Sequence, residues 1–137
     1  MKTPLIALFI FIAATLTACG GSSFEWFPKV QDTTPPTVTA TIGSTIFTNS
    51  TTYHKTIPPS VSVTLNGTDI GSAPVTIYYT TNNADPTTSS ASFTTSGSVS
   101  IDKNTLLTDL TSPWVLKFLG YDTVSNKSSI ITIMFKP

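Results

Sequence analysis

VTIYYTTNNADPTTSS, residues 75–90, is the stretch that decides the fold. Its first residues place Val75, Ile77 and Tyr79 on one side of the chain and Thr or Tyr on the other, and a period of two is typical of a β-strand with one buried face. β-Branched and aromatic residues also favour strands. The NNADP sequence that follows predicts a turn, because Asn tolerates a left-handed backbone and Pro has no N–H to donate. We therefore predict a central strand over residues 75–80 that ends in a loop.

The same alternation recurs in short segments that turn residues separate. Besides the central strand, we expect strands at residues 38–42, 60–65, 91–94, 98–102, 113–121 and 129–135. About seven short strands and no convincing long helix predict an all-β protein built as a β-sandwich, with a closed barrel as the alternative.

Three connecting segments also carry local signals. The Asn66-Gly67 pair predicts a turn directly after the strand at residues 60–65. Residues 48–59 are predicted to form a polar loop. Residues 104–112 carry leucines at roughly helical spacing and are predicted to form a single helical turn or a loop over the core.

The composition bounds the size of the fold and excludes one class of partner. The chain has 137 residues, enough for one well-covered core. Seven basic residues balance seven acidic ones, and none of the basic residues is arginine. Because phosphate neutralisation and bidentate base reading need Lys and Arg clusters, we expect no nucleic-acid partner.

The N-terminus is predicted to be an export signal. Lys2 precedes an almost wholly apolar run over residues 5–16, which is too short to span a membrane. The sequence Leu16-Thr17-Ala18-Cys19 follows, and it resembles the lipobox of bacterial lipoprotein signal peptides, in which the cysteine becomes the lipidated first residue of the mature chain. Cys19 is the only cysteine, so it has no disulfide partner within the chain. An ordinary secretory signal is the alternative.

This interpretation divides the chain into three parts. Residues 1–18 are predicted to be the signal peptide, residues 19–36 the lipidated cysteine and a flexible tether, and residues 37–137 the folded domain. The partner that follows is a membrane, bound through lipid on Cys19. Gly20 after the cysteine resembles lipoproteins sent on to the outer membrane, so we expect a bacterial cell-envelope protein anchored there.

Two segments together resemble a known family. YYTTNNADPT (residues 78–87) and LKFLGYDTVSNKS (residues 116–128) are similar to the Ig-like domains described as chitobiase or β-hexosaminidase C-terminal domains. The resemblance implies an Ig-like or fibronectin-III-like antiparallel β-sandwich, used as a non-catalytic accessory module on exported carbohydrate-active enzymes and surface proteins. Asn82-Asn83 replaces the usual Asp-Gly, and Ser125 replaces a usual Gly. A positive φ at Ser125 would cost about 1 kcal/mol.

No set of residues predicts catalysis. His54 stands alone in the predicted polar loop, and no glycine pattern frames a serine as a nucleophile elbow. Acids on separate turns are usually turn formers. We therefore predict that the protein is not an enzyme and needs no cofactor; a small hydrolase is the third-ranked class.

One end of the predicted sandwich has candidate metal ligands. Asp69, Asp122 and Asn126 lie on loops that this topology places at the same end, and their oxygens are the type that calcium binds. Asp85 is expected at the opposite end. Three side chains are too few for calcium without backbone carbonyls. The structural alternative is that the Asp122 carboxylate accepts amide hydrogens from its own turn.

Binding of a sugar would need flat, exposed aromatic rings, and the candidates are Tyr78, Tyr53 and Tyr121. Aromatic residues on strands are more often packing residues. The sequence thus predicts a lipid-anchored Ig-like module with a structural or binding role, whose further partner is a cell-surface glycan or another envelope protein. The alternative function is a carbohydrate-binding accessory module that works with an exported glycoside hydrolase.

Overall fold

The computed structural model describes residues 30–54, 60–102 and 114–136. Residues Gln31–Pro137 form one compact unit and Met1–Val30 another. All the described strands lie in the first of these units, which also includes residues 31–36, a segment that the sequence analysis assigned to the tether. Within the described ranges, no helix has the length and apolar character needed to cross a membrane.

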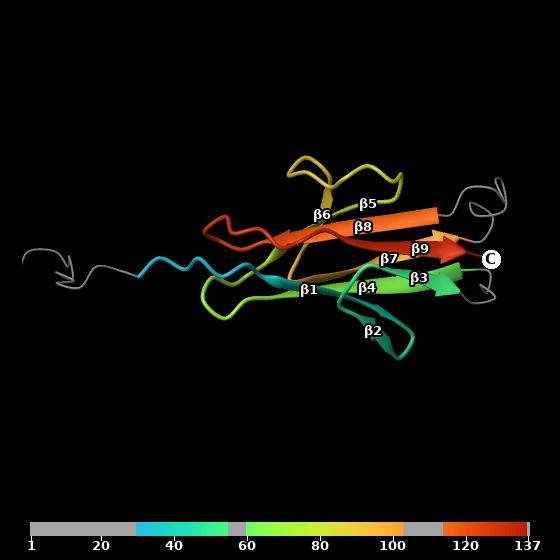
Figure 1. The fold of residues 1–137 in the computed structure, drawn as a ribbon, viewed down its shortest axis with the longest axis horizontal. Coiled ribbons are helices and arrows are strands. Elements are labelled where there is room, and N and C mark those ends of the chain that lie inside the picture. Colours follow the sequence, from blue (N-terminus) through green and yellow to red (C-terminus); the bar gives the residue numbers. More distant parts are fainter. Residues whose placement is uncertain (1–29, 55–59, 103–113, 137) are drawn as a thin grey trace, which may run out of the picture. The chain divides into compact units, whose positions relative to one another are not determined.

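The strands form two sheets that pack face to face (Figure 1). One sheet has the order β2-β1-β4-β7 and the other the order β3-β9-β8-β5-β6. The strands are β1 (Thr37–Ile42), β2 (Thr45–Phe47), β3 (Thr51–His54), β4 (Ser60–Thr68), β5 (Thr76–Thr80), β6 (Ala91–Thr94), β7 (Ser96–Asp102), β8 (Trp114–Tyr121) and β9 (Ile131–Lys136). The predicted all-β sandwich is confirmed. Its strands pair antiparallel as expected, except that β3 runs parallel to β9.

The core lies between the two sheets and is made by every second residue of their strands. Period-two alternation places these side chains on one face of each sheet, as the sequence predicts. The largest fully buried side chains are Phe118, Phe135, Leu65, Ile77, Ile101, Leu116, Leu119, Ile133, Val63 and Val75. All of them except Leu119 belong to one continuous hydrophobic cluster.

The middle strand of the five-stranded sheet is β8, and β5 lies beside it. The prediction that residues 75–80 form the central strand is therefore one position off. β8 can be central because both of its faces are covered. On its outer face Val115 and Leu119 are buried. On the same face Lys117 pairs with Asp85 of the loop after β5 at 2.8 Å, while Asn82 of that loop forms a backbone bridge beside Val115.

The predicted turn at Asn66-Gly67 is wrong, because β4 continues through both residues to Thr68. A glycine at position 67 allows the backbone of β4 to pack closely against Val75. A Cβ at this position would lie 2.7 Å from Cγ1 of Val75, and one at Gly120 in the opposite sheet would lie 2.8 Å from the same atom. Two glycines thus let the sheets approach each other around Val75.

The remaining local predictions concern one loop, two turns and one helical segment. The predicted polar loop at residues 48–59 contains β3, whose Thr-Thr-Tyr sequence favours a strand despite its polarity. Asn83 and Ser125 both adopt positive φ, 63° and 72°, as the turn chemistry implied. The helical turn predicted at residues 104–112 lies outside the described residues.

Substitution of Phe118 tests the inner face of β8. Phe118 is fully buried and pairs with Tyr79 on the neighbouring strand. We expect Phe118→Ala to lower the free energy of unfolding by about 3–5 kcal/mol through the lost burial and the cavity left behind. Ile46→Ala, at a side chain 64% exposed, is the control and should change it by less than about 0.5 kcal/mol. Equal denaturant midpoints for the two variants would contradict the assigned face.

Candidate functional site

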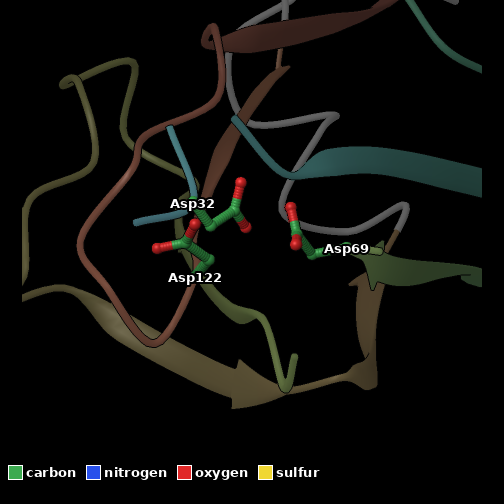
Figure 2. Close-up of side chains that lie close together, drawn as sticks. All are labelled: Asp32, Asp69 and Asp122. Carbon is green, nitrogen blue, oxygen red and sulfur yellow. The ribbon is translucent and has the colours of Figure 1, made fainter. Parts of the chain in front are cut away.

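Three segments meet at one end of the sandwich. They are the entry segment (residues 31–36) before β1, the β4–β5 loop (residues 69–75) and the β8–β9 loop (residues 122–130). They meet because β1 begins where β4 ends, with Thr37 paired to Thr68, and because Gly120 at the end of β8 packs close to Val38. Each segment contributes one aspartate, and Figure 2 shows that the three side chains lie close together.

Asp122 organises the β8–β9 loop. Its side chain is 7% exposed. Oδ1 accepts hydrogen bonds from the backbone N–H groups of Val124 (2.9 Å) and Asn126 (2.8 Å), and Oδ2 accepts one from the Asn126 side-chain amide (2.7 Å). The carboxylate therefore satisfies the amides of its own turn, which is the structural alternative that the sequence offered.

Asp69 holds the β4–β5 loop in the same way. Its Oδ1 accepts hydrogen bonds from the backbone N–H groups of Gly71 (2.8 Å) and Ser72 (2.7 Å). The two loops are then joined to each other, because the backbone N–H and the hydroxyl of Thr123 both donate to the Ser72 carbonyl oxygen, at 3.0 and 3.1 Å. These two loops, which with the entry segment we call the loop end of the sandwich, thus form one hydrogen-bonded unit.

Asp32 brings the entry segment into this unit. Its backbone carbonyl accepts a hydrogen bond from the Asn126 side chain (3.0 Å), and its Oδ1 accepts one from the Thr34 N–H (2.9 Å). Oδ2 is buried and has no hydrogen-bond partner within the described part of the chain. Gly71 lies so close to this oxygen that a Cβ there would collide with it.

The charge of Asp32 is stabilised by its surroundings. The Thr34 backbone amide is the main cause that holds the pKa of Asp32 below its ordinary value of 3.8, and the neighbouring Ser72 side chain lowers it further. Asp32 is therefore ionised at neutral pH, although two other aspartates lie beside it.

Asp32, Asp69 and Asp122 form what we call the acidic cluster. Each offers an oxygen that lies within 4.8 Å of the others, and among the described residues this is the group of His, Cys, Asp or Glu side chains placed to share a metal ion. Carboxylate oxygens suit calcium, which binds about six to eight oxygen ligands in total, from carboxylates, carbonyl groups and water. Asn126 directs its amide N–H, an unsuitable ligand, at Asp122 and Asp32. Calcium binding at this end stays a prediction, with Asp32 in the place of Asn126.

Asp32 is the residue that sequence analysis missed. It lies in the segment assigned to the tether, and its role depends on contacts with residues far along the chain. A local signal does exist: Asp32 is followed two residues later by Thr34 and then by two prolines. An Asp whose carboxylate bonds the amide two residues on is an Asx-turn, which orders the chain locally. Asp85 lies at the opposite end of β5 from this cluster, as expected from the antiparallel β5–β8 pair.

The three candidate tyrosines lie in two different places. Tyr78 and Tyr121 are half-buried on the outer face of the five-stranded sheet, and their rings meet edge to face with centroids 5.9 Å apart. Tyr53 instead packs against the core, with its ring 5.7 Å from Phe135 and 6.1 Å from Phe47. The structure thus brings two of the three rings together and places the third against the rings of Phe47 and Phe135.

Two packed sheets with a compact, hydrogen-bonded loop end define an Ig-like β-sandwich domain. A family model described as Fn3 associated matches residues 63–135, which is more than half of the chain and runs from β4 into β9. The chain belongs to this Fn3-associated family. Asp69 and Asp122 lie within the matched residues and Asp32 lies before them. No curated protein and no solved structure matches the chain.

Removal of the Asp122 carboxylate tests whether it organises the loop end. We expect Asp122→Ala to lower the free energy of unfolding by about 1–3 kcal/mol, because two backbone amides and the Asn126 side chain lose their acceptor. Asp85→Ala is the matched control: it breaks an ion pair whose Asp85 side chain is 67% exposed, which should cost less than about 1 kcal/mol. Chemical denaturation of both variants measures the difference. A stabilised Asp122→Ala protein would show that repulsion among the three carboxylates outweighs their hydrogen bonds.

Proposed function

We propose that this protein is a lipid-anchored, non-catalytic Ig-like accessory module of the bacterial cell envelope. The observation that carries the proposal is the combination of two features of one chain. Leu16-Thr17-Ala18-Cys19 directly follows an apolar run near the N-terminus, and the rest of the chain contains a domain of the Fn3-associated family. The first feature supports attachment to a membrane, with Gly20 favouring the outer membrane, and the second supports an accessory role.

The polar side chains of the domain support a structural role better than a catalytic one. Asp69 and Asp122 are engaged by amides of their own turns, and Asp85 pairs with Lys117 over the outer face of β8. A general acid or base must reach a substrate proton in a concave site. Each of these carboxylates instead holds a segment of the fold in place, as expected for a module that positions or connects other parts of the envelope.

A carbohydrate-binding accessory module is the second candidate function. The observation that favours it is the Tyr78–Tyr121 pair on the outer face of the five-stranded sheet. Aromatic rings are large apolar surfaces with a polar end, which suits sugar rings. In this proposal the domain is of the chitobiase C-terminal type and works beside an exported glycoside hydrolase. We rank it second because the two rings already cover each other.

The anchor is tested at Cys19. In cells that produce the Cys19→Ala protein, we expect no fatty-acid label on the protein and no cleavage before residue 19, because lipid transfer needs the thiol. Stable anchoring needs more than one acyl chain, since a single chain binds only marginally. Ser23→Ala, in the same segment, is the control and should be labelled as strongly as the parent. Equal labelling of the Cys19→Ala protein would refute the proposed lipid attachment at Cys19.

The two candidate functions are separated at Tyr78. We expect the parent protein to show no binding on a glycan array and Tyr78→Ala to lower stability, because loss of an aromatic pair costs about 0.5–1.5 kcal/mol beyond the lost burial. Tyr53→Ala, at the ring that packs on the core, serves as a reference for a purely structural tyrosine. Glycan binding by the parent that is lost in a Tyr78→Ala protein of unchanged stability would favour the carbohydrate-binding function instead.

A further inference from the structure

Two large apolar side chains are exposed on the loops that carry the acidic cluster. Ile70 is fully exposed at the tip of the β4–β5 loop, and Val124 is 40% exposed on the β8–β9 loop. Isolated exposed apolar residues are ordinary. Ile70 and Val124 are not isolated in this sense, because hydrogen bonds from Thr123 to Ser72 join the two loops that carry them. They therefore belong to one end of the domain.

The aspartates order the backbone beside both apolar residues. Asp69 bonds the amides of Gly71 and Ser72, which follow Ile70, and Asp122 bonds the amide of Val124 itself. These bonds order the backbone around each exposed side chain before any partner is present. A preorganised surface loses little conformational entropy when it binds. The loop end thus presents its apolar residues on an already ordered support.

The chain leading to the proposed lipid enters at this same end. Asn126 of the β8–β9 loop bonds the backbone of Asp32, in the entry segment. Roughly a dozen residues separate Cys19 from the start of the compact unit at Gln31, and a chain of that length reaches at most about 40 Å even when fully extended. A lipid on Cys19 would therefore keep the loop end close to the bilayer.

We propose that Ile70 and Val124 insert into the interfacial layer of the membrane that holds the lipid of Cys19, so that the domain contacts the bilayer with its acidic-cluster end. This inference rests on the proposed lipid anchor and adds an orientation to it. Tethering makes a weak contact sufficient, because a short linker gives the attached partner an effective concentration in the millimolar range. The two apolar side chains would enter the layer, and their exposed surface would leave water.

The acidic cluster determines which lipid surface suits the contact. Its three carboxylates lie beside the two loop tips, and Lys127 is an exposed positive charge on the β8–β9 loop. Anionic headgroups would repel the carboxylates, and zwitterionic headgroups would not. The contact should therefore be closest on a zwitterionic, phosphatidylethanolamine-containing bilayer.

The experiment places a fluorophore at each loop tip of the lipidated mature protein, which begins at Cys19. Ile70→Cys and Val124→Cys proteins are labelled with an environment-sensitive dye; the sulfur of Cys19 is occupied by the lipid, so only the new thiol reacts. Ile46→Cys is the matched control. Ile46 is also exposed and aliphatic, but it pairs with Thr41 near the far end of β1 from the entry segment. The proteins are reconstituted in phosphatidylethanolamine–phosphatidylcholine vesicles that contain nitroxide-labelled lipids.

Flotation with the vesicles reports the anchor, and dye quenching reports the contact. We expect all three proteins to float, with a blue shift and loss of fluorescence at positions 70 and 124 and neither at position 46. Proteins that float with equally weak quenching at all three positions would overturn the proposed contact and leave the anchor standing. Proteins that do not float would overturn the anchor and, with it, the orientation.

Discussion

Burial of one apolar face of each sheet is the interaction on which the rest of the structure depends. Phe118, Ile77 and their neighbours lie between the sheets and exclude water from the whole interface, and removal of apolar surface from water is the dominant favourable term in folding. The close approach of the sheets adds a second constraint. Gly67 and Gly120 leave room for Val75 between the sheets, at the end of the sandwich where the three segments meet.

Hydrogen bonds hold that end of the sandwich together. Asp122 and Asp69 each satisfy backbone amides of their own loop, and the Asn126 side chain ties the entry segment to them. Buried or half-buried amides would otherwise lack partners, at a cost of about 1–3 kcal/mol each. The convergence of three carboxylates is a consequence of this arrangement, because each loop needs an acceptor at nearly the same point.

The loop end of the sandwich also suggests how the domain would be oriented on a membrane if the proposed lipid anchor is present. A lipid on Cys19 would hold the entry segment near a bilayer, and the ordered loops would offer Ile70 and Val124 to it. Because the outer face of the five-stranded sheet carries Tyr78 and Tyr121, a further partner would meet a different surface from the loop tips. An accessory module that stands in a defined orientation can position such a partner, which a freely tumbling domain on a flexible tether cannot do.

The sequence by itself determined the class of fold, most strand positions and the turns at Asn83 and Ser125, because period-two alternation and turn chemistry are local properties. It also placed Asp69 and Asp122 at one end. Only the tertiary structure decided that Asn66-Gly67 lies inside a strand, since the reason is close contact with Val75, which directly precedes β5. It likewise decided that β8 is central, that β3 pairs in parallel with β9 and that Asp32 joins the cluster. These features depend on residues far apart in the chain, and no local pattern encodes which distant segments will meet.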